Sequence, residues 1–255
     1  MATAKTSKPK SYRVRESARA KHVSIKVSHL GEVEVVVPAG FDHRQIPDIL
    51  RKREDWIVKT TQRIVAERQS ISVPGAELNE PLPNTLGLRS LPEKWQILYE
   101  SSPNHLPSQV TITTLPQSRL SVQGAVDRPH LCHRALKQWL KRKAEIHLTA
   151  WLRQTSHEVG LPFEQATVRG QKTLWASCSA KTNISLNYKL LFLPPHLVRY
   201  VFIHELCHTI HLNHSRRFWA LVAEKEPNYK RFDTELNKAW IYIPEWIERS
   251  SEDAK

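Results

Sequence analysis

The residues best suited to chemistry are two histidines four positions apart with a glutamate beside the first, in His204-Glu205-Leu206-Cys207-His208. On an α-helix, side chains four positions apart lie on one face, so the two imidazoles can bind the same divalent ion. The carboxylate next to the first histidine can reach a water molecule at that ion and act as a general base. Two histidines and a glutamate in this pattern are typical of zinc hydrolases.

A catalytic zinc site needs a third protein ligand as well as an open position. His214 follows His208 by six residues, a spacing at which a helix can end and the chain can return to the metal. Asn213 tolerates the left-handed conformation and is expected to end the helix. His211 falls on the helix face that carries His204 and His208, so spacing alone leaves it open as a ligand, as a neighbour of the ligands or as a solvated residue. We expect one Zn²⁺ per chain, although manganese, iron or cobalt can occupy such ligands.

Apolar residues at helical spacing surround the motif and predict a partly buried helix. They are Val198, Val201, Phe202 and Leu206. The helix is expected to start at Leu193-Pro194-Pro195, because proline is favoured in the first turn. A chance match to so short a motif would more often lack this setting, and we therefore interpret the histidines as a metal site.

The chain carries a formal net charge of +13. Residues 165–204 contain five basic residues and no Asp or Glu: Arg169, Lys172, Lys181, Lys189 and Arg199. Arg216 and Arg217 follow the third histidine. A positive field around a metal favours an anionic substrate, and a solvated basic surface explains the charge equally well. The candidate substrate contacts of this kind are Arg169, Lys172, Arg216 and Arg217.

Composition limits the class of protein. The chain is 40% hydrophobic with 8 Trp, which is enough for a substantial core. No run approaches the roughly 18 to 20 apolar residues that span a membrane, and the basic N-terminus has no apolar core typical of a secretory signal. The three cysteines are scattered without a Cys-x-x-Cys pair, as in reduced proteins. We predict a cytoplasmic protein without membrane partners.

The patterns predict four parts of the chain. Residues 1–10 form a basic tail, 11–125 a β-rich module, 126–247 a catalytic domain and 248–255 a second tail. The expected strands of the module are 22–28 and 32–38, which form a hairpin, and 95–99, 109–113 and 120–123. The module also contains an expected helix over 42–68, capped by Asp42, and a loop over 70–93.

The catalytic domain is expected to begin with an amphipathic helix over 130–158 that ends at Gly160. The further expected elements are a strand at 167–170, a loop over 171–179, a strand at 183–188, the metal helix, and helices at 216–226 and 229–240. The fold class is α+β: a zincin-like C-terminal metallohydrolase domain, preceded by a small, mostly antiparallel β module with one helix.

Strand 183–188 is our candidate for an edge strand that receives an extended polypeptide by backbone pairing. Trp175 and Ser177 are expected to shape the wall of the site. Asn187, Tyr188 and Tyr229 are candidates for stabilising an oxyanion, although packing explains each of them too.

The chain resembles the YgjP-like metallopeptidase family, relatives of the SprT-like and WLM zinc proteases. The matching stretches are Trp175-Ala-Ser-Cys-Ser179, Ile184-Ser-Leu-Asn-Tyr188, Leu193-Pro-Pro195, His204-Glu-Leu-Cys-His208, Asn213-His-Ser215 with Phe218-Trp219, and, in the N-terminal half, Val35-Val-Val-Pro38 and Asp55-Trp-Ile57. The resemblance implies a zincin fold with His204, His208 and His214 as zinc ligands and Glu205 as the base. Ala176 and Cys207 depart from the family's usual residues, and residues 70–125 match it poorly.

Three functions remain open from the sequence. The first is a zinc-dependent hydrolase that cleaves peptide bonds. The second uses the same site to hydrolyse a phosphoanhydride or phosphodiester in a nucleotide, as in a nucleoside triphosphate pyrophosphatase acting on UTP. The residues that would hold phosphates are Arg169, Lys172, Lys189, Arg216 and Arg217. The third is a protease or binding protein associated with nucleic acid through its basic surface.

Overall fold

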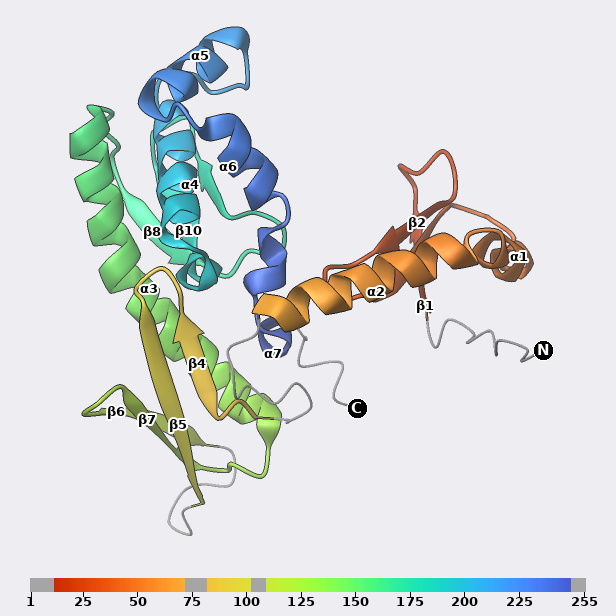
Figure 1. Ribbon diagram of the computed structural model, residues 1–255, viewed down its shortest axis with the longest axis horizontal. Coiled ribbons are helices and arrows are strands. Elements are labelled where there is room, and N and C mark those ends of the chain that lie inside the picture. Colours follow the sequence, from red (N-terminus) through yellow and green to blue (C-terminus); the bar gives the residue numbers. More distant parts are fainter. Residues whose placement is uncertain (1–11, 72–81, 102–108, 249–255) are drawn as a thin grey trace. The chain divides into compact units, whose positions relative to one another are not determined.

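The computed structural model describes residues 12–71, 82–101 and 109–248 (Figure 1). The two predicted tails lie outside these residues, except for the Glu248 end of the second. The chain divides into two compact units, residues 1–72 and 73–255. The predicted boundary at about residue 125 therefore differs from the one in the structure.

The first unit is a three-stranded sheet covered by helices. Its strands are β1 (Tyr12–Ser17), β2 (Ser24–Val27) and β3 (Val33–Pro38), in the order β1-β3-β2. Strands β2 and β3 are antiparallel, which confirms the predicted hairpin, whereas β1 is parallel to β3. Alternate residues of β3 pack on the helices in a small core, formed by Val33, Val35, Val37, Ile46, Leu50 and Ile57.

The single helix predicted over 42–68 is broken in the structure. Asp42 accepts a hydrogen bond from the Arg44 backbone N–H and caps a 3₁₀ turn, η1 (His43–Gln45), before α1 (Ile46–Arg51) and α2 (Glu54–Ile71). The break lies at Lys52-Arg53, where the backbone N–H of Arg53 donates to the carbonyl of Leu50 in a tighter turn. No glycine or proline marks this break in the sequence, so the apolar periodicity alone did not predict it.

The second unit begins with a four-stranded sheet in the order β4-β5-β7-β6. Its strands are β4 (Thr85–Leu88), β5 (Glu93–Ser101), β6 (Val110–Leu115) and β7 (Arg119–Gly124). Strand β4 lies in the segment predicted as a loop. It was missed because its two buried leucines make too short a pattern to recognise. Strands β5 and β7 are parallel, whereas the other two pairings are antiparallel, so the sheet is more mixed than expected.

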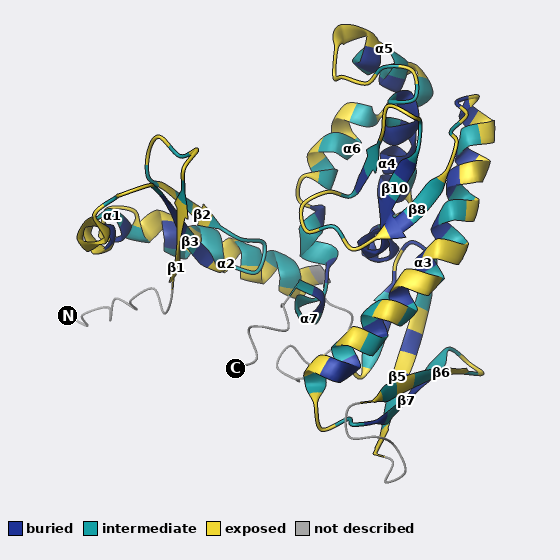
Figure 2. Cartoon of the chain, turned by 180° about the vertical axis from the view of Figure 1, so that it is seen from behind, coloured by how far each residue is buried: buried dark blue, intermediate teal, exposed yellow. Residues whose placement is uncertain are grey.

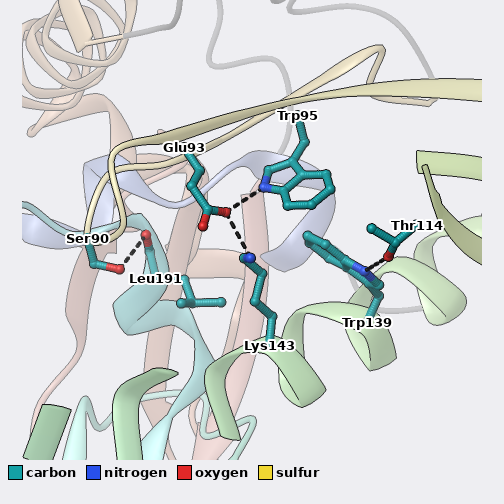
Figure 3. Close-up of polar contacts among 7 residues, drawn as sticks. All are labelled: Ser90, Glu93, Trp95, Thr114, Trp139, Lys143 and Leu191. Atoms are coloured by element: carbon teal, nitrogen blue, oxygen red, sulfur yellow. Dashed lines mark hydrogen bonds and ion pairs between the residues drawn. The ribbon is translucent and has the colours of Figure 1, made fainter. Parts of the chain in front are cut away.

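This sheet belongs with the C-terminal part of the chain because it shares a core with helix α3 (Pro129–Val159). The helix begins at Pro129 and ends at Gly160, whose φ of 69° is left-handed, as predicted. Polar contacts also join the two (Figure 3): the Lys143 ammonium lies 2.9 Å from the Glu93 carboxylate, which accepts a hydrogen bond from the Trp95 indole. Trp139 of α3 packs edge-on against Trp95 and donates to the Thr114 hydroxyl.

A second small sheet leads into the metal helix. Its strands are β8 (Ala166–Arg169), β9 (Ala176–Cys178) and β10 (Ile184–Asn187), in the order β8-β10-β9. The predicted strand at 183–188 is present as β10, but it is the central strand and not the edge. The two edge strands are β8 and β9, and the three residues of β9 were predicted as loop. The substrate-pairing role inferred for β10 is therefore wrong, because both of its backbone edges are already paired.

The remaining elements surround a buried helix, α4 (Pro195–Cys207). They are η2 (Tyr188–Phe192), α5 (Arg216–Lys225), α6 (Tyr229–Leu236), η3 (Ala239–Tyr242) and α7 (Glu245–Glu248). Helix α4 packs against α3 and α6 (Figure 1) and is mostly buried, whereas α3 exposes one side to solvent (Figure 2). Ser90, in the turn between β4 and β5, donates through its hydroxyl to the Leu191 carbonyl of η2 (Figure 3). The fold class is α+β, as predicted. None of the described helices is both long and apolar enough to cross a membrane.

Candidate metal centre

Helix α4 ends at the second histidine of the motif. The backbone N–H of His208 bonds to the carbonyls of His204 and Glu205, and that of Thr209 bonds to Leu206. The Thr209 hydroxyl donates to the same Leu206 carbonyl at 2.7 Å. These contacts satisfy the last carbonyls of the helix. Asn213, predicted to end the helix, lies beyond it and does not have a positive φ.

The three predicted ligands come together at the end of this helix. His204, His208 and His214 each offer a ring nitrogen, and these nitrogens lie within 4.8 Å of one another. The Nε2 atoms of His204 and His214 are 3.0 Å apart. Since zinc–nitrogen bonds are about 2.0–2.1 Å long, three nitrogens this close can bind one ion. Ser215 directly follows the third histidine and caps α5 by accepting from the Phe218 N–H.

His211 is a neighbour of the ligands, one of the three roles that spacing left open, and it contacts them through its backbone. Its carbonyl oxygen lies 2.9 Å from Nδ1 of His208. A carbonyl only accepts hydrogen bonds, so Nδ1 carries the proton and Nε2 keeps the lone pair that binds a metal. The imidazole of His211 is not part of the three-histidine group.

Glu205 is a buried carboxylate beside the histidines, with 7% of its surface exposed. Burial raises its pKa to about 7, against the opposing effect of a hydrogen bond with the backbone of Cys178 in β9. Burial, followed by the neighbouring His208 and His214, lowers the pKa of His204 to about 3. His204 is therefore neutral near pH 7, the form that binds metals.

Aromatic side chains of α5 pack around the three imidazoles. The fully buried Phe218 ring stacks on His208 at a centroid distance of 4.4 Å and lies 5.0 and 4.8 Å from His204 and His214. Trp219 stacks on His214 at 5.6 Å. The sequence placed these two residues against the core and did not link them to the ligands. Their positions four and five residues after His214, on a capped helix, were the available signal.

Two residues proposed to line the site lie in or beside β9. Trp175 stacks on Trp240 of η3 at 4.0 Å, and Ser177 is paired with Ser185 of β10. Because the backbone of Cys178 bonds to Glu205, this strand runs beside the carboxylate.

Asn187 does not have the geometry of an oxyanion donor, whereas the oxyanion role of Tyr188 stays a prediction. The fully buried Asn187 amide donates to the carbonyls of Gln171 and Leu174 at 2.9 and 2.8 Å, and its oxygen accepts from the Lys189 N–H. Both of its donor hydrogens are thus occupied, and it holds the loop before β9. The buried Tyr188 ring packs closely on Gly170, and burial raises its pKa to about 12.

The basic residues that lead into the metal helix separate into two groups. Lys189 is buried, lies 2.6 Å from the Glu248 carboxylate and packs over Trp240, and Arg199 forms an ion pair with Glu158 at 2.6 Å. The exposed group consists of Arg169, Lys172 and Lys181, and Arg216 and Arg217 after His214 are exposed as well. The proposed phosphate-binding set therefore loses Lys189 to an internal ion pair.

Comparison with known proteins identifies the family of the chain. Residues 21–239 match the family model described as YgjP-like, metallopeptidase domain. The match covers most of the chain and supports a metal-dependent, peptidase-type hydrolase. The chain belongs to the YgjP-like metallopeptidase family. The chain is also similar to the metallopeptidase zymogen of Pyrococcus abyssi abylysin, known from a crystal structure. The two share 25% sequence identity and a TM-score of 0.32, and the match covers 35% of this chain and 90% of that one. No curated protein matches the chain.

Proposed function

We propose that the protein is a zinc-dependent hydrolase that cleaves peptide bonds, with Glu205 as the general base. The proposal rests on one observation: three imidazoles with converging ring nitrogens adjoin a buried carboxylate at the end of α4.

The donor set fits a catalytic zinc ion. His204, His208 and His214 would supply three neutral nitrogen ligands and leave a fourth position open. A zinc ion held there polarises a carbonyl group and makes a water molecule easier to deprotonate. The backbone carbonyl of His211 would orient His208 for this role. The single group of three histidines among the described residues supports one ion per chain as part of the proposal.

Glu205 would move the proton. Its carboxylate accepts a proton from the attacking water and passes it to the leaving amine, which needs a pKa close to the working pH. Burial raises the pKa of Glu205 to about 7, which suits both steps. The hydrogen bond from the strand beside it holds the carboxylate in place.

Strand β9 takes the substrate-pairing role that we first gave to β10. In the described part of the chain, β9 pairs with β10 alone, so its other edge offers backbone donors and acceptors to an extended polypeptide. Because Cys178 of this strand bonds to Glu205, a polypeptide on β9 would run past the carboxylate.

A turnover screen tests the proposal. The zinc-loaded protein, Glu205→Gln and the control Glu224→Gln, which changes an exposed glutamate of α5, are each given unstructured polypeptides and a panel of nucleoside triphosphates that includes UTP. We expect peptide cleavage by the first and third proteins. Cleavage should fall at least about 100-fold in Glu205→Gln, with zinc content unchanged.

Two results would contradict the proposal. Peptide cleavage that persists in pure Glu205→Gln would remove Glu205 as the base. Release of pyrophosphate or phosphate that depends on Glu205, without any proteolysis, would assign the site to phosphoanhydrides, with the exposed arginines beside His214 as candidate phosphate contacts.

A further inference from the structure

The third histidine is held differently from the other two. His204 and His208 lie on or at the end of a buried helix, whereas His214 is exposed and lies in the non-helical segment before α5. His208 is oriented by the carbonyl of His211. Among the described residues, the ring of His214 has one polar atom within hydrogen-bonding distance, the Nε2 of His204. That atom is itself a proposed metal ligand. The orientation of His214 therefore needs another source.

Trp219 provides a flat surface for this ring. Its indole stacks on His214 with a centroid distance of 5.6 Å and an interplanar angle of 27°. On His204 the same indole packs edge-on, at 70°. Trp219 stacks in turn on Tyr229, at 5.6 Å and 25°. The three rings His214, Trp219 and Tyr229 thus form a series of near-parallel contacts, which aromatic rings favour.

The other end of this series is tied to the metal helix. Tyr229 begins α6, and the Tyr200 hydroxyl of α4 donates to Asp233 of α6 at 3.0 Å. His196 of α4 lies 2.9 Å from the Glu235 carboxylate of α6. The exposed ligand is therefore connected, through two aromatic rings and α6, to the helix that carries the other ligands.

Trp219 and Tyr229 pack against the core but are less buried than Phe218. Phe218 is fully buried and fills space beneath all three imidazoles, whereas Trp219 and Tyr229 are only partly buried. At a partly buried position that served packing alone, an aliphatic side chain would lower stability without changing how a metal ligand is held. Stacking on an imidazole requires an aromatic ring.

We propose that Trp219, supported by Tyr229, is a positioning residue that holds His214 in its metal-binding orientation and thereby slows the loss of zinc. This inference rests on the proposed ligand set. Partners that orient metal ligands typically change metal affinity by about 10- to 100-fold when they are removed. Trp219 would act through a stacked face, as the carbonyl of His211 acts on His208 through a hydrogen bond.

The test measures zinc loss from the full chain into an excess of a chromophoric chelator. Trp219→Leu should release zinc at least about tenfold faster than the unchanged protein, and Tyr229→Leu should change the rate in the same direction. Trp219→Phe and Tyr229→Phe should stay within about threefold, because a stacking ring remains. The visible spectrum of the Co²⁺-loaded protein should change in Trp219→Leu and not in Trp219→Phe.

Trp139→Leu is the matched control, since it removes a partly buried indole of α3 that packs on Trp95 and not on a histidine. It should lower the thermal midpoint of the metal-free protein without changing zinc loss. The inference is overturned if Trp219→Leu and Tyr229→Leu release zinc at the unchanged rate, or if Trp139→Leu speeds release equally. His214→Ala separates the two hypotheses: if it too leaves zinc loss unchanged, the proposed ligand set is at fault.

Discussion

At the scale of single residues, burial shifts the pKa values of both the candidate ligands and the candidate base in the direction that their roles require. Burial is the largest cause of the lowered pKa values of His204 and His208 and of the raised pKa of Glu205. Desolvation disfavours every charged form, so it acts in opposite directions on a base and an acid. It keeps imidazoles neutral for a metal and moves a carboxylate towards the pKa range of a general base.

The histidine spacing predicted this group because helical geometry alone puts His204 and His208 on one face. The role of Asn187 was beyond the sequence, because its amide bonds to carbonyls 13 and 16 positions away. Only the folded loop brings those carbonyls to one buried amide. A polar residue near a motif therefore looks like a substrate contact in the sequence. Long-range hydrogen bonds, visible only in the structure, can show that its polar atoms are already occupied.

Asn187→Ala should destabilise the protein and act on catalysis only through that loss. The change leaves two carbonyls and one N–H without their buried partner, which costs about 2–3 kcal/mol. Urea unfolding of the metal-free protein measures the cost, and Asn237→Ala at an exposed position of α6's C-terminal end should stay within about 0.5 kcal/mol. If Asn187→Ala instead lost turnover at unchanged stability, the amide would contact the substrate after all.

At the scale of elements, periodicity predicted the long pieces and missed the short ones. Helix α3 and the alternating segment 183–188, which contains the four residues of β10, have patterns long enough to recognise, and both were predicted. Strands β4 and β9 have four and three residues, too few to show alternation. The omission of β9 had a functional consequence, because it made the central strand of the sheet look like the edge.

The buried ion pair between η2 and α7 gives a prediction at this scale. Lys189 and Glu248 have side chains that are 6% and 12% exposed. Burial lowers the pKa of the partly buried Lys137, and the charge of Lys189 lowers it further. Lys189→Met would leave the Glu248 carboxylate without this cation in a poorly solvated position. We expect a loss of about 2–4 kcal/mol in unfolding free energy.

The exposed Lys172 is the comparison for this pair, because the phosphate-binding hypothesis grouped it with Lys189. Lys172→Met should change the unfolding free energy by less than about 0.5 kcal/mol, as measured by urea denaturation of both variants. Equal, small effects on stability would show that the Lys189–Glu248 contact contributes little and would return Lys189 to the set of candidate phosphate contacts.

At the scale of the whole molecule, the boundary between the units depends on which apolar residues share a core. Residues 85–124 resemble the N-terminal segment in their strand-like patterns, so the sequence grouped them with it. In the structure, Leu86, Trp95 and Leu120 pack in the core of α3 and α4, whereas Val35 and Ile57 belong to a separate core. Strand patterns show that a strand is present but not the side chains on which it packs.

Separate cores predict separate unfolding of the two units. Unfolding enthalpy scales with length at about 0.7 kcal/mol per residue near 60 °C, so calorimetry should resolve a smaller transition of about 50 kcal/mol and a larger one of about 130 kcal/mol. All three candidate ligands lie in the larger unit. Zinc bound to the native form of that unit would add about 2.7 kcal/mol of stability at 100 times its Kd.

A chelator should therefore lower the midpoint of the larger transition by about 5–10 °C and leave the smaller one in place. His208→Ala should abolish the response to chelator, whereas Glu205→Gln should keep it, because the base is not a ligand. A single transition that moves as a whole would mean that the units unfold together. If a chelator lowered only the midpoint of the smaller transition, the metal would bind the smaller unit and not the ligands at α4, since binding energy stabilises only the unit that holds the ion.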